Sequence, residues 1–275
     1  MSDVSSENGE NGGDSAASLF MELASETRFS ILMSLSRRPA RLSSLSRELD
    51  TTAQDVFRNL NRMAEEGLVK KTDGEFSITE YGRMVVSQMP YFSFIQKHKK
   101  FLESHSLSGI PVAFLPRIGE LAECTTINSV TEVFQKLKKL ESNAKSSLKV
   151  MVPQAWPEEG EIFIDRASHG VQVRSIVGHN TIIPKNVIET VGDTLEKLTK
   201  GEFFATRMIE KISIGIYICD ESQAGLMFPR SDGEVDMTAL FLSDDSRFCA
   251  WCAGLFNYFW QGAKRFDVRK AKVVE

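Results

Sequence analysis

The sequence predicts an α+β winged helix-turn-helix, then a linker helix, then an α/β domain. Three observations carry this prediction. A helix-turn-helix pattern and an alternating hairpin pattern follow each other over residues 42–79, and an aromatic helical stretch follows at 81–108. From residue 129, helical and strand periodicities alternate, which is typical of an α/β domain. The predicted parts are a disordered tail (1–17), the winged helix (18–80), a linker or dimerisation helix (81–108), the α/β sensor or assembly domain (109–268) and a second tail (269–275).

Composition sets the broad class of protein. The chain has 275 residues, enough for two domains with separate cores, and it is 42% hydrophobic and 25% charged, as soluble globular proteins are. No apolar run approaches the roughly 18 residues that cross a bilayer, so we expect no membrane partner. Four cysteines are too few for a disulfide framework and favour a cytoplasmic setting. The net charge of −4 limits any nucleic-acid binding to local basic patches, because phosphates require lysine and arginine.

The helix-turn-helix is predicted from the spacing of apolar residues. Leucines recur at helical intervals over residues 42–49, and Val56, Leu60 and Met63 mark the buried face of a second helix over 52–66. Between the two helices, residues 50–52 form a turn whose last residue, Thr52, can cap the second helix. We therefore expect two short helices joined by a tight turn.

The wing is predicted from the residues that follow. Gly67 ends the second helix, and Asp73-Gly74 separates two alternating runs over 68–72 and 75–79. An Asp-Gly pair between such runs is a strong signal for a two-residue hairpin. A helix, turn, helix and wing in this order is typical of proteins that bind double-stranded DNA.

Individual DNA contacts follow from helical geometry. The outward face of helix 52–66 carries Gln54, Arg58 and Asn61, whose side chains can pair bidentately with base edges. We predict that these three residues read bases. The residues predicted to hold phosphates, which position the protein without reading sequence, are Thr52, Arg62, Lys70 and Lys71. A winged helix that serves only as a protein-protein module, with its polar face in solvent, stays open as the alternative.

Two further helices flank the winged helix in the prediction. Residues 18–36 form one helix that packs behind the helix-turn-helix, and residues 81–107 form a second that is interrupted at Met89-Pro90. The second helix is rich in aromatic residues. We favour its burial against a second copy of the chain, and hence a homodimer, over a surface that binds nucleic acid. Its aromatic and aliphatic residues are Phe92, Phe94, Ile95, Phe101 and Leu102, around the basic cluster Lys97, His98, Lys99 and Lys100.

The elements of the α/β half alternate along the chain. Helices are expected over 130–142, 187–198 and 246–264, and strands over 148–152, 171–177, 203–208, 212–219 and 224–228. The last helix has Phe248, Trp251, Cys252, Leu255 and Phe259 on one face. Phe256 and Trp260 give this helix a second apolar edge.

These residues resemble known families. Residues 43–69 resemble archaeal and bacterial regulators of the ArsR-like winged-helix group. The segments 105–111, 114–121 and 233–237 and the helix at 251–260 are similar to archaeal transcriptional regulators with a methanogenesis regulatory protein middle domain. The resemblance implies an archaeal DNA-binding transcriptional regulator whose second domain senses a small-molecule effector or dimerises. The metal-binding cysteines of ArsR sensors have no counterpart near the second helix, so metal sensing is not implied.

The α/β half also looks like phospholipase D-like sensor domains. Their catalytic strand has His and Lys two residues apart and Asp five residues further on. Here Ser213 and Gly215 stand at the first two positions, and Asp220 at the third. Without His no phosphohistidine can form, so we expect a binding scaffold and not an enzyme. Two alternatives stay open: a phosphodiesterase-like hydrolase, and a winged-helix assembly module without DNA affinity.

Other candidate sites have plainer interpretations. Cys249 and Cys252 form a CxxC on an aromatic helix with no second ligand pair, which indicates buried thiols rather than zinc. His169 and His179 flank a strand and are interpreted as loop or cap residues. The carboxylates of residues 220–245 match no cation loop and are interpreted as solvated turns. We predict no metal and no cofactor, and the sequence assigns no ligand-binding residues.

Overall fold

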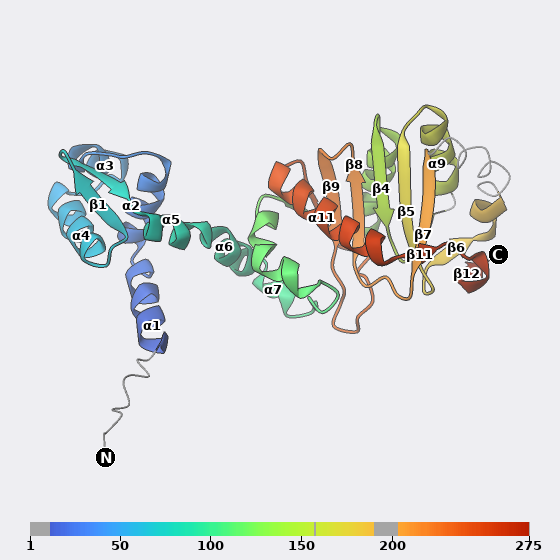
Figure 1. The fold of residues 1–275 in the computed structure, drawn as a ribbon, viewed down its shortest axis with the longest axis horizontal. Coiled ribbons are helices and arrows are strands. Elements are labelled where there is room, and N and C mark those ends of the chain that lie inside the picture. Colours follow the sequence, from blue (N-terminus) through green and yellow to red (C-terminus); the bar gives the residue numbers. More distant parts are fainter. Residues whose placement is uncertain (1–11, 157, 190–202, 275) are drawn as a thin grey trace, which may run out of the picture. The chain divides into compact units, whose positions relative to one another are not determined.

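The computed structural model describes residues 12–156, 158–189 and 203–274, and the chain divides into two compact units, Met1–Met89 and Pro90–Glu275. Figure 1 shows the elements of each unit. No helix among the described residues is both long and apolar enough to cross a membrane.

The first unit is a winged helix-turn-helix, as the sequence predicted. Its core joins the buried faces of three helices and the hairpin, with Ile31, Leu45, Leu60 and Phe76 at its centre. The elements are α1 (Gly12–Leu23), α2 (Glu26–Arg37), α3 (Leu42–Glu48), α4 (Ala53–Glu65), β1 (Val69–Thr72), β2 (Glu75–Ile78) and α5 (Glu80–Ser87).

The wing is a two-residue hairpin. Thr72 pairs with Glu75, and between them Asp73 and Gly74 have φ of 50° and 81°. Positive φ at both central residues is the geometry that matches the twist of the strands, and Asp-Gly adopts it readily. The predicted turn is therefore confirmed. Ala40 adds a bridge to Phe76, with its N–H 3.0 Å from the Phe76 carbonyl.

The amino-terminal helix differs from its prediction. Two helices, α1 and α2, replace the single helix expected over 18–36, because Ser25 caps α2 by accepting a hydrogen bond from the Arg28 N–H. A serine cap favours the start of a new helix over continuation of the preceding one. The apolar spacing continues across this break, so it did not indicate that the helix divides. Helix α1 begins at Gly12, inside the predicted tail, whose residues 1–11 lie outside the described part of the chain.

The predicted linker is divided between the two units. Helix α5 is capped by Thr79 and belongs to the first unit, whereas α6 (Met89–Lys97) and α7 (Lys99–Leu102) pack in the second. The predicted interruption near Pro90 is present, since α5 ends before α6 begins at Met89.

The aromatic residues of this segment do not have the packing partner that was predicted for them. Phe94 is 1% exposed, with its ring centroid 6.3 Å from that of Phe241 and 4.7 Å from that of His98. Phe101 packs against the same core. Lys97 donates to the backbone carbonyls of Ala122 and Cys124, at 3.4 and 3.2 Å. The burial proposed against a partner copy is therefore wrong for Phe94 and Phe101, because the chain's own sheet covers them.

The second unit is built on an eight-stranded mixed sheet with the order β11-β7-β5-β4-β8-β9-β10-β3. Strands β4, β5 and β7 are parallel, and the others pair antiparallel. The strands are β3 (Thr125–Ile127), β4 (Ser147–Met151), β5 (Gln172–Gly178), β7 (Phe204–Ile209), β8 (Gly215–Cys219), β9 (Gln223–Met227), β10 (Leu240–Ser243) and β11 (Lys264–Arg265).

Helices cover both faces of this sheet. Helix α11 (Ser246–Gly262) and the 3-10 helix η1 (Val112–Leu121) pack together on one face, while α8 (Val130–Ser142) and α9 (Glu159–Ser168) lie on the other (Figure 1). The indole N–H of Trp251 donates to the Phe114 carbonyl at 3.3 Å, which ties α11 to η1. The α/β prediction is confirmed, including both ends of α8.

Some helices and strands were not predicted from the sequence. Helix α9 and strands β3 and β10 were not expected, and they complete the sheet and its cover. The predicted tail at 269–275 contains β12 (Lys272–Val274), which pairs in parallel with β6 (Ile182–Pro184). Of the helix expected over 187–198, residues 185–189 are helical and 190–198 lie outside the described residues.

Candidate nucleic-acid interface and the polar sites of the second unit

Helix α4 begins at a strong cap. Thr52 Oγ1 accepts a hydrogen bond from the Asp55 N–H at 3.1 Å and donates to Asp55 Oδ2 at 2.7 Å. This satisfies an N–H that would otherwise lack a partner in the first turn. The capping role predicted for Thr52 is confirmed, and its predicted phosphate contact stays a prediction.

The outward face of α4 carries the three predicted base readers. Gln54, Arg58 and Asn61 are exposed, while Val56, Leu60 and Met63 on the opposite face are buried. The spacing 54, 58, 61 places the three polar side chains along one stripe of the helix. The structure thus brings these residues together on an accessible surface.

A fourth residue on this stripe was missed. Phe57 is 44% exposed, and its position between Gln54 and Asn61 at helical spacing puts it on the same face. An exposed phenyl ring on this face can contact the methyl group of thymine.

Arg58 has a local partner. Its Nη2 lies 3.0 Å from Asp55 Oδ1, and the two side chains remain 78% and 44% exposed. A solvent-exposed pair of this kind is worth little, so a stronger acceptor can replace Asp55. The guanidinium is held near the helix and is still available to a base edge.

Arg62 pairs with a buried carboxylate of its own unit. Its Nε lies 2.8 Å and its Nη2 2.5 Å from Glu22 Oε1, and Glu22 is 3% exposed. Arg28 Nε lies 3.1 Å from the other Glu22 oxygen. The Glu22 hydrogen bond raises the pKa of Arg62. The structure therefore gives Arg62 a role in fastening α1 to α4, which differs from the free phosphate contact predicted for it. A partner forty residues away cannot be inferred from periodicity.

The wing lysines are on the predicted strand. Lys70 and Lys71 are both exposed on β1, and Lys71 Nζ lies 5.4 Å from the centroid of the Phe76 ring. On the other side of the turn, Arg47 of α3 is also exposed. Arg47 is a basic residue near the recognition helix that the sequence did not single out.

In the second unit, the strand that resembles a phospholipase strand ends at a structural carboxylate. Asp220 accepts hydrogen bonds from the N–H groups of Lys145, Ser146 and Ser147, at 2.7–3.1 Å, and from the Ser146 hydroxyl. Burial opposes ionisation, but these donors outweigh it and lower the pKa of Asp220 to about 2. Asp220 thus anchors the segment that leads into β4.

The other two positions of that strand lie against backbone or core. A Cβ on Gly109 would come within 2.5 Å of Ser213 Oγ, so the chain passes directly over Ser213. Gly215 is buried against Met227. Ser213 has no imidazole that could form a phosphohistidine, and Gly215 has no side chain that could hold a phosphate.

The CxxC thiols are buried. Cys249 is 2% and Cys252 0% exposed. Burial raises the pKa of Cys249 to about 11 and that of Cys252 well above its usual value. Reactive cysteines have a low pKa and solvent access, so these two thiols are unsuited to redox chemistry.

Two of the segments that carry the family resemblance meet in a side-chain hydrogen bond between His105 and Asp236. His105 Nε2 lies 3.0 Å from Asp236 Oδ2, and both side chains are about nine-tenths buried. The ring stacks on Phe101, and its Nδ1 lies 2.8 Å from the Phe101 carbonyl oxygen. This contact joins the end of the aromatic segment to the loop after β9.

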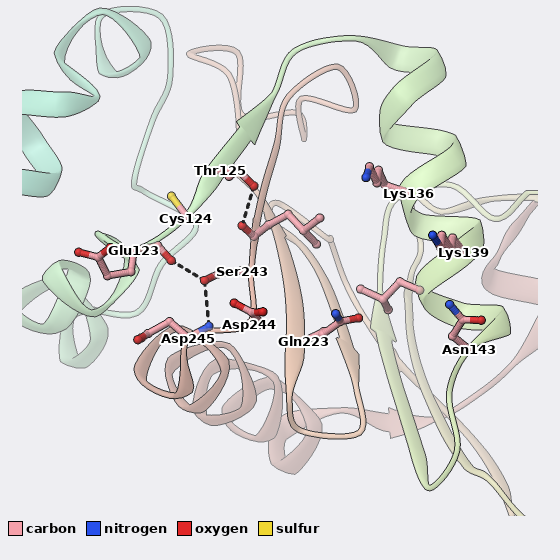
Figure 2. Close-up of a pocket in the computed structure, with 12 residues that line it drawn as sticks. Glu123, Cys124, Thr125, Lys136, Lys139, Asn143, Gln223, Ser243, Asp244 and Asp245 are labelled. Carbon is pink, nitrogen blue, oxygen red and sulfur yellow. Dashed lines mark hydrogen bonds between the residues drawn. The ribbon is translucent and has the colours of Figure 1, made fainter.

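A polar hollow of about 710 Å³ lies between α8 and the β10 edge. Figure 2 shows Lys136 and Lys139 on one wall and Asp244 and Asp245 on the other. Much of the acidic wall already has a local role: Ser243 Oγ donates to the Glu123 carbonyl and accepts from the Asp245 N–H, and Asp245 caps α11. No group of three or more metal-ligating side chains occurs among the residues that the structure describes.

The fold defines a two-domain protein, a winged helix-turn-helix followed by an α/β domain. Two family models match the chain: residues 18–98 match the HVO_A0261 N-terminal domain, and residues 128–262 match the middle domain of the methanogenesis regulatory protein FilR1. The chain therefore carries these two domains in this order.

Solved structures of similar fold were also found. The archaeal chromatin protein TrmBL2, whose structure is described as showing a novel mode of DNA binding, is 13% identical, with 93% of this chain and 100% of that chain covered and a TM-score of 0.39. Two others each match 52% of this chain and 99% of their own. The phospholipase D family member Nuc from Salmonella typhimurium is 11% identical with a TM-score of 0.39, and NucT from Helicobacter pylori is 13% identical with 0.40. No curated protein matches the chain.

Proposed function

We propose that this protein is a DNA-binding transcriptional regulator in which α4 reads bases in the major groove. The observation that carries the proposal is the outward stripe of Gln54, Arg58 and Asn61 on a helix whose opposite face is fully buried. Only a helix anchored in this way can present several base-reading side chains in a fixed register. The match of the second half to a methanogenesis regulatory protein model supports regulation as the outcome.

Two sets of contacts have different tasks in this proposal. Gln54, Arg58 and Asn61 would specify sequence, with Phe57 adding an apolar contact. Lys70 and Lys71 of the wing and Thr52 at the helix cap would bind phosphates and set the register. Arg62 would act indirectly, by holding α4 against α1 through Glu22.

The second unit would provide the input. We propose that it senses a small molecule or mediates homodimerisation and that it is not an enzyme. Ser213 and Gly215 stand where a phospholipase needs its nucleophile and its phosphate-binding lysine, and Asp220 is occupied by backbone donors. Phosphodiester cleavage by the purified protein that disappears in Asp220→Ala but persists in Asp244→Ala would contradict this.

A matched pair of arginine variants tests base reading. Arg58 pairs with Asp55 three residues earlier on α4, and Arg83 pairs with Glu80 in the same way on α5, so the two arginines have similar local surroundings. A preferred site is first selected from random duplexes with the wild-type chain. Arg58→Ala should weaken binding to that site by about 1–3 kcal/mol, as loss of one bidentate base contact does, and should affect random DNA much less. Arg83→Ala should leave both unchanged. Equal losses of Arg58→Ala on selected and random DNA would refute the base-reading role.

A further inference from the structure

The wing has a third extended segment beside its two strands. Arg38 and Arg41 have extended backbone conformations. Between them, Ala40 exchanges two backbone hydrogen bonds with Phe76 of β2, at 3.0 and 2.8 Å. Ala40 and Phe76 are both buried, so they lie on the core side of this small sheet. Because side chains alternate along an extended chain, Arg41 lies on the solvent side, opposite Glu75.

Arg41 lies at the end of this sheet that carries the turn. The register places Thr72, Glu75 and Arg41 in one row across the three segments. The turn Asp73-Gly74 follows Thr72 directly, so this row is the last one before the turn. Lys70 lies in the next row, on the far strand. Two strand spacings and two residues of rise separate Arg41 from Lys70, so their Cα atoms lie roughly 12 Å apart. The solvent face of the wing thus has one cation at each edge.

The Arg41 side chain has no task in holding the unit together. It is 70% exposed, and its Nε lies 3.5 Å from Oε1 of Glu75, which is itself 48% exposed. An exposed pair of this kind contributes little to stability. Arg41 stands at the N-cap position of α3, yet its side chain makes no capping hydrogen bond. Arg62, by contrast, is bound to the buried Glu22. The Arg41 guanidinium is therefore available to an anion from outside.

The segment around Arg41 is strongly basic. Residues 37–47 contain four arginines and no acidic residue, although the whole chain has a net charge of −4. The four are Arg37, Arg38, Arg41 and Arg47. All of them are exposed, and of the four only Arg41 forms an ion pair with a residue that the structure describes. An anion with several charges along a line complements such a set. A duplex is an anion of this kind, with one phosphate per strand for about every 3.4 Å of its axis.

This basic surface adjoins the proposed recognition helix. Helix α4 packs against α3, which Arg41 directly precedes, and against β1, which carries Lys70. Figure 1 shows the hairpin together with α3 and α4 at one end of the first unit. A helix in the major groove has a sugar-phosphate strand on each side of it. Cations that flank such a helix meet phosphates, which position the protein on the duplex, and not base edges.

We infer that Arg41 binds a phosphate of the duplex, and that Arg41 and Lys70, at opposite edges of the wing, hold two different phosphates beside the groove that α4 enters. A guanidinium has five N–H donors, so Arg41 can bind a phosphate bidentately while it stays beside Glu75. The inference rests on the proposed DNA binding. It adds to that proposal a contact from outside the recognition helix and the two wing strands.

Salt dependence tests whether Arg41 meets a phosphate. Binding of the full-length protein to the selected duplex and to random duplexes is measured by fluorescence anisotropy from 50 to 300 mM salt. Arg41→Gln should weaken binding to both by a similar factor of about threefold or more, and should reduce the slope of log K against log salt by about 0.9. Arg41→Lys keeps the charge and should retain most of the slope. Arg83→Gln, which removes an arginine that pairs with Glu80 on α5, should change neither quantity. Circular dichroism checks the fold of each variant.

Neutral backbone positions show which phosphate each residue holds. In a set of selected duplexes, one phosphate at a time is replaced by a methylphosphonate, which carries no charge. At one position the replacement should weaken binding of the wild type about threefold or more and leave binding of Arg41→Gln almost unchanged, because the partner of that phosphate is already absent. The position that behaves in this way for Lys70→Ala should be a different one. Equal losses for the wild type and Arg41→Gln at every position, or a single position shared by both residues, would overturn the inference.

The outcomes also separate this inference from the DNA-binding proposal. If the wild type binds DNA and Arg58→Ala loses selectivity, while Arg41→Gln keeps both affinity and slope, only the Arg41 contact is refuted. If the wild-type chain binds no duplex at low salt, the DNA-binding proposal fails and the inference fails with it.

Discussion

The two units differ in where they place conspicuous polar side chains. In the first, Gln54 and Asn61 point to solvent from a helix whose other face is packed. In the second, Glu141, Glu159 and Tyr217 are buried, and a hydrogen bond links the two glutamate carboxyls. An exposed polar stripe suits a large partner such as a duplex, whereas polar groups that are paired inside the fold are not available to one. The proposed DNA contacts therefore belong to the first unit.

The largest expected effect comes from comparing a buried residue with an exposed residue of helix α11. Trp251 of α11 is fully buried and donates to the Phe114 carbonyl, so Trp251→Ala should lower the free energy of unfolding by about 3–5 kcal/mol. Tyr258 on the same helix is 53% exposed, and Tyr258→Ala should cost under about 1 kcal/mol. Urea denaturation followed by circular dichroism measures both. Equal losses would show that α11 is not packed as described.

The next effect concerns the buried charge of the first unit. Glu22→Gln removes the carboxylate that binds Arg28 and Arg62. We expect this change to lower the free energy of unfolding by roughly 2 kcal/mol. The loss is smaller than that for breaking a fully buried ion pair, because the Arg62 side chain is 57% exposed. The exposed Glu65 serves as control, and Glu65→Gln should change stability by under about 0.5 kcal/mol. Thermal unfolding compares them. If both variants melt with the wild type, Glu22 does not fasten α1.

A smaller effect depends on pH. The pKa of Asp220 is about 2 in the folded protein and about 3.9 in unfolded chains, so its contribution is complete above pH ~4 and is lost as pH falls toward 2. Asp220→Asn should cost about 1 kcal/mol at neutral pH, after discounting for its partial exposure, and almost nothing at pH 2.

The control for this experiment is Asp244, an exposed residue of the same unit. Urea midpoints at pH 7 and pH 2 are compared for Asp220→Asn and Asp244→Asn. Asp244→Asn should track the wild type at both values. A deficit of Asp220→Asn that persists undiminished in acid would contradict the ionised state assigned to the carboxyl.

The smallest effect separates phosphate contacts from base contacts. Lys70→Ala or Lys71→Ala should weaken binding to all duplexes by a similar factor and reduce the slope of log K against log salt by about 1. Lys138→Ala, an exposed change on α8, should leave the slope unchanged. Fluorescence anisotropy with labelled duplexes provides the measurement. Losses confined to one DNA sequence would mean that the wing reads bases.

Local sequence patterns predicted the elements whose structure depends on neighbouring residues. The hairpin follows from Asp73-Gly74, and the limits of α8 follow from its apolar stripe and the Ser129 cap. The exposed stripe of α4 follows from the buried positions opposite to it. These elements needed no knowledge of the remaining fold, and in each the structure agrees with the prediction.

Features set by distant contacts could not be predicted in this way. The partner of Arg62 lies forty residues away on α1, and Phe94 is covered by Phe228 and Phe241, which follow more than a hundred residues later. The neighbours of Ser175, Val150 on β4 and Thr206 on β7, depend on a register between three strands that only the folded sheet sets. Periodicity shows that a residue will be buried and does not show against what.

The salt dependence of DNA binding tests the central claim most directly. Affinity of the wild-type chain for its selected duplex is measured from 50 to 300 mM salt. Each phosphate contact contributes about −0.9 to the slope of log K against log salt, so Lys70 and Lys71 alone predict a slope steeper than about −1.8. A slope of that size, together with a loss of selectivity in Arg58→Ala but not in Arg83→Ala, is the predicted result. Undetectable binding at low salt, or a slope near zero, would contradict the assignment of this protein as a DNA-binding regulator.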